Sequence, residues 1–173
     1  MHIRLRRLGA LLFACALCAP FAALAHPSII YLVRHAEKQT GDDPPLTPPG
    51  ELRATTLATL LGQARIGAIF STETRRTRAT AQPLAQRLGL TVQVYDAKQQ
   101  AQTLAAKLKP LTGAVLVVGH SNTLSETVRL LGGDPGKDIA DHEFDRLYQL
   151  IYHPGGTVTT VLLTVPPPTG PAP

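Results

Sequence analysis

The chain has 173 residues, of which seventeen are Lys or Arg and twelve are Asp or Glu, so its formal net charge is +5. Residues 1–25 hold three of the basic residues and none of the acidic ones, and the remaining 148 residues therefore have a net charge of only +2. A net charge this small does not indicate nucleic-acid binding. The length is enough for one domain with a sizeable core.

Residues 1–25 have the layout of a secretory signal peptide. Three arginines precede an apolar run over residues 8–24, and the small-residue sequence Ala-Leu-Ala ends at residue 25. Cleavage before His26 would place the protein in the periplasm or outside the cell. A retained membrane helix is the alternative, but the run is short for spanning a bilayer and contains Pro20.

Both cysteines of the chain, Cys15 and Cys18, lie in this N-terminal segment. The mature protein would therefore have no disulfide and no thiol chemistry, and its core alone would hold it together in an oxidising compartment. Lipidation of Cys15 is an alternative to simple export, with an unusually short apolar region before it. We expect no stable membrane insertion after cleavage.

Strand-like and helix-like patterns alternate along residues 29–131. Three helical stripes with i, i+3, i+4, i+7 spacing fall at residues 57–64, 81–88 and 101–108, and a fourth at 124–131 stops at two glycines. This order predicts an α/β fold, a three-layer α/β/α sandwich with right-handed crossovers. The short apolar runs that predict its parallel strands, each buried on both faces, are Ile29–Val33, Ala68–Phe70, Val92–Tyr95 and Ala114–Val118.

The C-terminal part of the chain has a different pattern. Two further apolar stretches, residues 147–152 and 158–165, flank the turn sequence His-Pro-Gly-Gly and predict an antiparallel hairpin added to the mostly parallel sheet. Residues 166–173 are rich in proline and poor in apolar side chains, so we expect a disordered tail. The predicted domain therefore spans residues 26–165.

Histidines and arginines follow the predicted parallel strands. His35 lies two residues beyond the first run, and His120 lies two residues beyond the fourth. Because parallel strands end at the same edge of the sheet, where ligands bind, we expect the two histidines to converge there. Arg34 and the arginines of the sequence STETRRTRATA, residues 71–81, should lie at the same edge.

A positive pocket with a histidine at its floor suits phosphoryl transfer. Guanidinium groups match the oxygens of a phosphoryl group bidentately, and a neutral imidazole nitrogen is a competent nucleophile for phosphorus. Neighbouring arginines would keep the imidazole neutral by charge repulsion. Fixed cations can stabilise the transition state, so this chemistry requires no metal or other cofactor, and residues 26–173 contain no HExxH, EF-hand or CxxC spacing.

Four sequence motifs together resemble those of a known family. LVRHAEK, LTPPGELRA, STETRRTRATA and VVGHSNT occur in the order of the four signatures of the histidine phosphatase superfamily, in the branch that includes phosphoglycerate mutases. The resemblance covers most of residues 29 to 165. One arginine-histidine pair would be a weak signal, whereas four motifs in order are a specific one.

The resemblance implies roles for five residues. His35 would be the nucleophile that becomes phosphohistidine, and Arg34 and Arg76 would bind the transferring phosphoryl group. His120 would be the second active-site histidine and hydrogen-bond the phosphate, with the backbone N–H of Ser121 nearby. Arg75, beside Arg76, remains open as the second phosphate-binding arginine.

Two positions depart from the family pattern. Ala36 replaces the usual glycine after the nucleophilic histidine, which requires a slightly wider turn or a backbone without positive φ. The general acid is often a glutamate after the third strand, where this chain offers only Asp96, our candidate. The other acids left open are Glu37, Glu126, Glu143 and Asp145.

Three functions follow from these expectations. The first is a metal-independent phosphomonoesterase that acts on a small-molecule phosphate ester through phosphohistidine. The second is phosphoglycerate mutase-like phosphoryl transfer, which the export signal and the short chain disfavour. The third is a non-catalytic phosphate-binding or interaction module, which the intact set of arginines and histidines disfavours. The sequence does not reveal the oligomeric state or the natural substrate.

Overall fold

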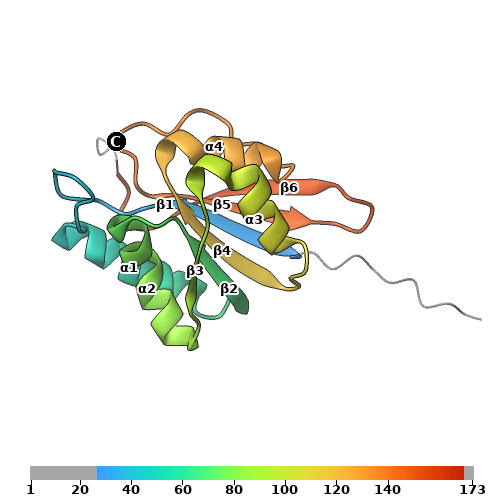
Figure 1. The fold of residues 1–173 in the computed structure, drawn as a ribbon, viewed down its shortest axis with the longest axis horizontal. Coiled ribbons are helices and arrows are strands. Elements are labelled where there is room, and N and C mark those ends of the chain that lie inside the picture. Colours follow the sequence, from blue (N-terminus) through green and yellow to red (C-terminus); the bar gives the residue numbers. More distant parts are fainter. Residues whose placement is uncertain (1–26, 170–173) are drawn as a thin grey trace, which may run out of the picture.

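Six strands form one mixed sheet in the computed structural model, which describes residues 27–169 (Figure 1). The strand order is β3-β2-β4-β1-β5-β6, in which the first four strands are parallel and the last two form an antiparallel hairpin. The predicted α/β fold and its C-terminal hairpin are thus confirmed. The strands are β1 (Ile29–Arg34), β2 (Ile66–Ser71), β3 (Val92–Val94), β4 (Ala114–Gly119), β5 (Arg146–Tyr152) and β6 (Val158–Thr164).

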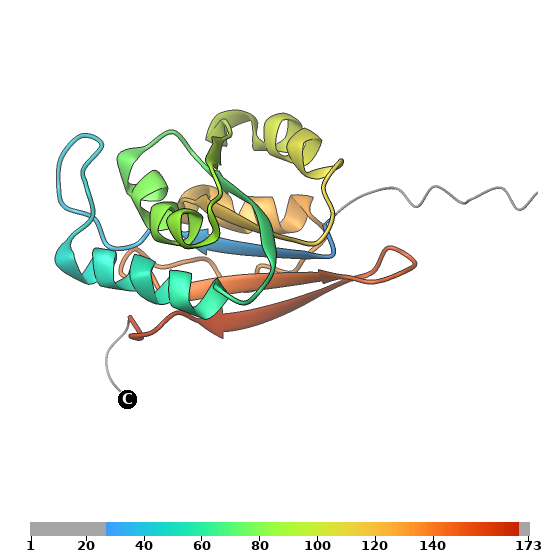
Figure 2. The ribbon, with the colours of Figure 1, turned by 90° about the horizontal axis from the view of Figure 1, so that it is seen from below.

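Helices cover both faces of the sheet, which gives three layers (Figures 1 and 2). Apolar side chains of α1 and α2 pack on one face, and those of α3 and α4 pack on the other. Strands β1 and β4 lie between the layers and are almost completely buried, as their continuous apolar sequences predict. The helices are α1 (Pro48–Leu61), α2 (Arg75–Leu88), α3 (Gln100–Leu108) and α4 (Ser121–Leu130), with a short 3-10 helix η1 (Ala97–Gln99) before α3.

The buried face of α1 differs from the predicted stripe. Leu60 is 48% exposed, and Ala64 lies beyond the end of the helix. Ala54 and Ala58 complete the buried face with Leu57 and Leu61, because these four positions keep the helical spacing. The predicted stripe was therefore displaced from the buried face. The prediction favoured leucines because they are more hydrophobic than alanines, whereas the close packing of α1 on α2 buries small alanine side chains.

The start of α1 supports the loop that follows β1. The Thr47 hydroxyl accepts a hydrogen bond from the Gly50 N–H at 3.3 Å and caps the helix, and the Thr47 N–H donates to the Glu37 carbonyl at 2.9 Å. A Cβ at Gly50 would lie 2.1 Å from that carbonyl oxygen. Glycine is therefore required here, because the first turn of α1 contacts the backbone two residues after His35.

The first residues of the proline-rich segment are ordered against the domain, in contrast to the disorder expected for residues 166–173. The Val165 and Pro167 carbonyls accept hydrogen bonds from Arg53, and the Thr169 hydroxyl donates to Asp145 at 2.6 Å. Side-chain partners from the domain thus replace the missing apolar surface. Residues 170–173, and residues 1–25 with the expected signal peptide, lie outside the described part of the chain.

Within residues 27–169, no helix combines the length and the apolar character needed to span a bilayer.

Candidate active site

The carboxyl ends of β1 and β4 bring the two histidines together. The strands are parallel neighbours with Arg34 in register with Gly119, and the His35 N–H donates to the Gly119 carbonyl at 2.9 Å. The imidazole centroids of His35 and His120 lie 5.5 Å apart, with the rings inclined by 65°. Two residues 85 positions apart therefore meet at the sheet edge where ligands bind in open α/β folds.

Backbone contacts orient the His35 ring. Its Nδ1 lies 2.8 Å from the Ala36 carbonyl oxygen, which can only accept, so Nδ1 carries the proton. In the neutral ring, Nε2 is then the nitrogen with the free lone pair. The Ala36 N–H donates to Thr80 Oγ1 at 3.0 Å, and Ala36 does not adopt a positive φ. Alanine at this position is thus compatible with the turn.

Both histidines are held in the neutral form. Burial, together with the charges of Arg34, His120 and Arg76, lowers the pKa of His35 to about 3, although the hydrogen bond to the Ala36 carbonyl acts to raise it. Burial and the same two arginines lower the pKa of His120 to about 4. A neutral imidazole is the form in which His35 can attack phosphorus.

These shifts predict a pH dependence of stability. The unfolded chain binds protons at both histidines below about pH 6.5, whereas the folded protein does not until near pH 4 and pH 3. Stability should therefore fall as the pH drops from about 6.5. Urea denaturation at about pH 7 and about pH 4.5 should show a smaller loss for His35→Asn than for the wild type. Equal losses in the two proteins would contradict the shift at His35.

Arg34 is fixed by the loop between α4 and β5. Its Nη1 donates to the carbonyls of residues 140, 141 and 143 at 2.8–3.0 Å, and its guanidinium lies 4.1 Å above the Phe144 ring. Its Nε is buried and has no hydrogen-bond partner. Sequence reasoning missed Phe144 and this loop, because no local pattern links them to a residue more than a hundred positions away.

Arg76 lies beside both histidines, since its charge contributes to the lowered pKa of each. Its Nε, like that of Arg34, is buried and has no hydrogen-bond partner within residues 27–169, so two guanidinium donors near the histidines are unsatisfied there. Buried donors are normally paired, and such orphans mark a place where an acceptor binds. The Arg75 side chain, by contrast, is exposed.

Asp43 connects the loop after β1 to the start of α2. Its Oδ1 accepts a hydrogen bond from the Arg75 N–H at 2.9 Å and lies 3.4 Å from Arg76 Nη1. The sequence GDDPP at 41–45 is typical of a turn and does not by itself indicate this contact. The carboxylate helps to orient Arg76 while its partial exposure keeps the interaction weak.

His120 directly precedes α4, and its ring contacts the segment between β2 and α2. Its Nε2 lies 2.8 Å from Thr72 Oγ1. Ser121 is the first residue of α4, where helix geometry provides no intrahelical acceptor for the backbone N–H. The predicted phosphate donor at Ser121 thus lies next to His120, at the positive end of the helix.

Two acids line a cavity of about 340 Å³ together with His120. One is Asp96, the predicted general acid, and the other is Glu73, which sequence reasoning missed because it lies inside the arginine motif. Asp96 Oδ1 accepts a hydrogen bond from the Lys98 N–H at 2.8 Å. Glu126 is exposed on α4. The other three alternative acids already have side-chain partners, in the pairs Glu37–Arg53, Glu143–Arg146 and Asp145–Thr169.

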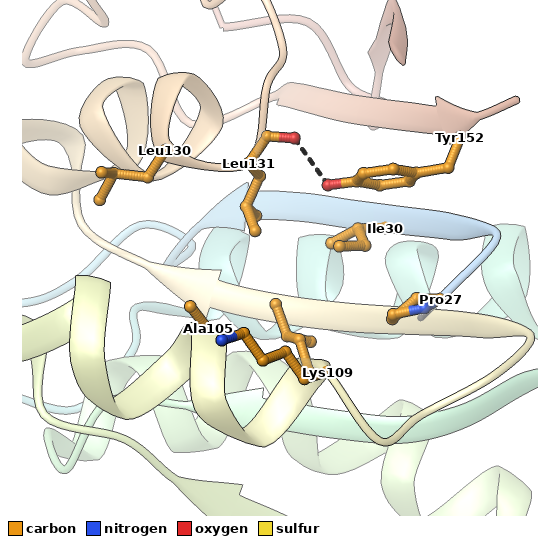
Figure 3. A pocket seen from close by; sticks show the side chains of 8 residues that line it. Pro27, Ile30, Ala105, Lys109, Leu130, Leu131 and Tyr152 are labelled. Atoms are coloured by element: carbon orange, nitrogen blue, oxygen red, sulfur yellow. Dashed lines mark hydrogen bonds between the residues drawn. The ribbon is translucent and has the colours of Figure 1, made fainter. Parts of the chain in front are cut away.

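A separate apolar cavity lies near the amino end of β1 (Figure 3). It has a volume of about 220 Å³ and opens between α3 and α4, where the Tyr152 hydroxyl donates to the Leu131 carbonyl. Its polar side chains are Lys109 and Tyr152, and no histidine lines it. This cavity therefore lacks the groups that phosphoryl transfer needs.

Within residues 27–169, no group of three or more His, Cys, Asp or Glu side chains is placed to hold a metal ion. The charges facing the two histidines are those of Arg34 and Arg76, together with Asp43. The site is thus arranged to bind an anion.

Comparison with known proteins finds related sequences. Residues 30–98 match the model of the histidine phosphatase superfamily, branch 1. A protein of Escherichia coli named "Probable phosphoglycerate mutase GpmB" is 33% identical over 105 residues, which are 56% of this chain and 44% of the relative. The chain thus matches less than half the length of that curated relative.

Solved structures share the fold. A mycobacterial glucosyl-3-phosphoglycerate phosphatase is 18% identical with a TM-score of 0.58, over 79% of this chain and 97% of the other. A phosphoserine phosphatase of Entamoeba histolytica is 17% identical with a TM-score of 0.58, over 79% and 95%. SixA of Agrobacterium tumefaciens is 22% identical with a TM-score of 0.60, over 74% and 94%. The match over residues 30–98 covers less than half of this chain, and the likeness to the solved structures shows that the chain shares their fold.

Proposed function

We propose that this protein is a metal-independent phosphomonoesterase that acts through a phosphohistidine at His35. One observation carries the proposal: a neutral histidine with a free Nε2 lies among two arginines whose buried Nε donors have no partner. A phosphoryl group supplies the missing acceptors and the electrophile at the same place. The family match and the phosphatases among the structural neighbours support the same reaction class.

In the first step of this reaction, His35 Nε2 attacks the phosphorus atom of the ester. The bond from phosphorus to the ester oxygen breaks while the N–P bond forms. The Arg34 and Arg76 guanidinium groups bind the phosphoryl oxygens, and the Ser121 N–H adds a further donor. Asp96 gives a proton to the departing oxygen. Water then hydrolyses the phosphohistidine and regenerates neutral His35.

The substrate that we propose is a small-molecule phosphate ester. Two structural neighbours are named as phosphatases of glucosyl-3-phosphoglycerate and phosphoserine, both small phosphate esters, whereas the SixA neighbour is named as a phosphohistidine phosphatase. The cavity beside His120 offers Glu73, Asp96 and Lys98 to the part of the substrate that leaves. Polar or charged leaving groups therefore suit it better than apolar ones.

Turnover without metal tests this function. Residues 26–173 should hydrolyse p-nitrophenyl phosphate in the presence of a chelator. The phosphoenzyme should be trapped without acid quenching, because phosphohistidine is hydrolysed in acid. Asp96→Asn should retain most of this activity, because p-nitrophenolate leaves without a proton. The same variant should lose about 10²-fold with an alkyl phosphate.

Two other results would redirect the proposal. No turnover of either ester, with phosphate still bound, would favour the non-catalytic phosphate-binding module. Phosphoryl exchange that requires a bisphosphate primer would favour mutase-like transfer, the activity in the name of the Escherichia coli relative. Retention of alkyl phosphate turnover by Asp96→Asn would assign the proton donor elsewhere, with Glu73 as the other acid in the cavity.

We extend the proposal to the location of the protein. The arrangement of basic, apolar and small residues over 1–25 supports export to the periplasm or the medium, followed by cleavage before His26. A phosphatase there would act on esters outside the cytoplasm. Sequencing the amino terminus of the protein recovered from an exporting host would test the cleavage.

A further inference from the structure

A row of threonine hydroxyls lies behind His120. Thr72 Oγ1 is 2.8 Å from His120 Nε2 and 2.9 Å from Thr77 Oγ1. Thr77 Oγ1 is in turn 2.9 Å from the Thr74 carbonyl and 3.1 Å from the Thr72 carbonyl. Thr77 Oγ1 also lies 2.9 Å from the Thr74 hydroxyl, and Thr72 and Thr77 are 2% and 0% exposed, so the protein itself must satisfy their hydroxyls.

The carbonyls at the end of the row fix its direction. A carbonyl can only accept, and each hydroxyl has a single hydrogen to donate. When Thr77 donates to the nearer carbonyl, that of Thr74, its contacts with the hydroxyls of Thr72 and Thr74 contain a hydrogen only if those two hydroxyls donate to it. The contact between Thr72 and His120 then requires the hydrogen of His120 Nε2. In the reverse direction, neither carbonyl contact of Thr77 would contain a hydrogen.

The other ring nitrogen of His120, Nδ1, is not part of the threonine row. His120 occupies the N-cap position of α4, yet its side chain makes no capping hydrogen bond. The ring is neutral, because burial and two arginines lower its pKa to about 4. With Nε2 protonated and bound to Thr72, Nδ1 is an unprotonated nitrogen that the fold leaves unused within the described residues.

We propose that Thr72 and Thr77 are positioning residues that hold His120 in the Nε2–H tautomer, so that its Nδ1 accepts the proton of the water that hydrolyses the phosphohistidine. This inference rests on the proposed function. It also changes the role expected from the sequence, in which His120 hydrogen-bonds the phosphate. An unprotonated Nδ1 cannot donate to a phosphoryl oxygen, and it acts there as a base.

The proton and electron balance of this step is complete. The water oxygen bonds to phosphorus, and the N–P bond breaks with its electron pair returning to His35 Nε2. The water proton moves to His120 Nδ1, and the imidazolium releases a proton to solvent as phosphate leaves. In the empty site the two arginines disfavour the His120 imidazolium. The bound phosphoryl group partly neutralises them, so His120 is a stronger base in the phosphoenzyme than in the empty site.

Imidazole ¹⁵N chemical shifts test the tautomer without any requirement for activity. In the phosphate-free wild-type protein at about pH 7, His120 should show a protonated Nε2 and an unprotonated Nδ1. Thr72→Val should give a mixture of the two tautomers, whereas Thr72→Ser, which keeps the hydroxyl, should resemble the wild type. A wild-type spectrum with protonated Nδ1, or no change in Thr72→Val, would overturn the proposal.

Single-turnover decay of the phosphoenzyme provides the kinetic readout. Thr72→Val should slow this decay about 10²-fold, with the rate restored in Thr72→Ser. Unchanged decay in Thr72→Val would overturn the role of the hydroxyl row. If Thr72→Val does not fold, Thr77→Val breaks the same row one residue further from the ring and replaces it in both measurements. Absence of any phosphoenzyme alongside the expected tautomer would count against the proposed function and not against the tautomer.

Discussion

His35→Asn should abolish hydrolysis of p-nitrophenyl phosphate, with a loss of at least about 10³-fold in kcat. Asparagine offers no nitrogen nucleophile, and an activated ester needs little help other than the nucleophile. The side chain of His35 is 3% exposed and is held by the Ala36 carbonyl, so its Nε2 is oriented in advance. Steady-state kinetics and trapping of a labelled phosphoenzyme would measure both consequences.

The matched control for this variant is His153→Asn. His153 follows β5 in the exposed hairpin turn, where its ring is 2.9 Å from the Thr159 hydroxyl. It should keep wild-type activity and form the phosphoenzyme. If His35→Asn retained activity within about tenfold of the wild type while its thermal unfolding remained cooperative, the phosphohistidine mechanism would be wrong.

Arg53→Met should lower the free energy of unfolding by about 3 kcal/mol, the scale for breaking a buried ion pair by removing one partner. Arg53 is 3% exposed and binds both carboxylate oxygens of Glu37, together with the Val165 and Pro167 carbonyls. Burial alone would raise the pKa of Glu37, but the hydrogen bonds from Arg53 outweigh it and lower that pKa. Methionine fills the space and leaves the carboxylate and carbonyls without a donor. Urea denaturation near pH 7 would measure the loss.

Two further variants distinguish the ion pair from a general effect of losing an arginine. Arg129→Met removes an exposed arginine from α4 and should change stability by less than about 0.5 kcal/mol. Arg53→Met combined with Glu37→Gln should recover part of the loss, because no uncompensated charge remains. A loss below about 1 kcal/mol for Arg53→Met alone would show that the pair behaves as a surface salt bridge.

Arg53 is connected to the turn that contains His35 through Glu37. Glu37 follows Ala36, and its carbonyl accepts hydrogen bonds from the Thr47 N–H and hydroxyl. The motif LTPPGELRA therefore acts as a support for the turn that presents His35. It contributes the helix cap, the glycine that allows close approach, and the arginine that neutralises the buried acid. Its role is structural, in contrast to the motifs that contain the candidate catalytic residues.

The sequence determined the fold class and the convergence of Arg34, His35 and His120, because apolar β-branched runs form buried parallel strands and parallel strands end at one edge. Only the tertiary structure decided which charges face the site. The resemblance favoured Arg76 and left Arg75 open, and in the structure the charge of Arg76 acts on both histidines while the Arg75 side chain is exposed.

The tertiary structure also decided the protonation of the site, since burial is the largest cause of both lowered histidine pKa values and depends on long-range packing. The threonine row behind His120, the loop that holds Arg34 and the contact of Asp43 with Arg76 join residues that no local periodicity relates. Patterns along a chain report which surfaces are apolar. The partners of a polar side chain depend on which segments meet in space.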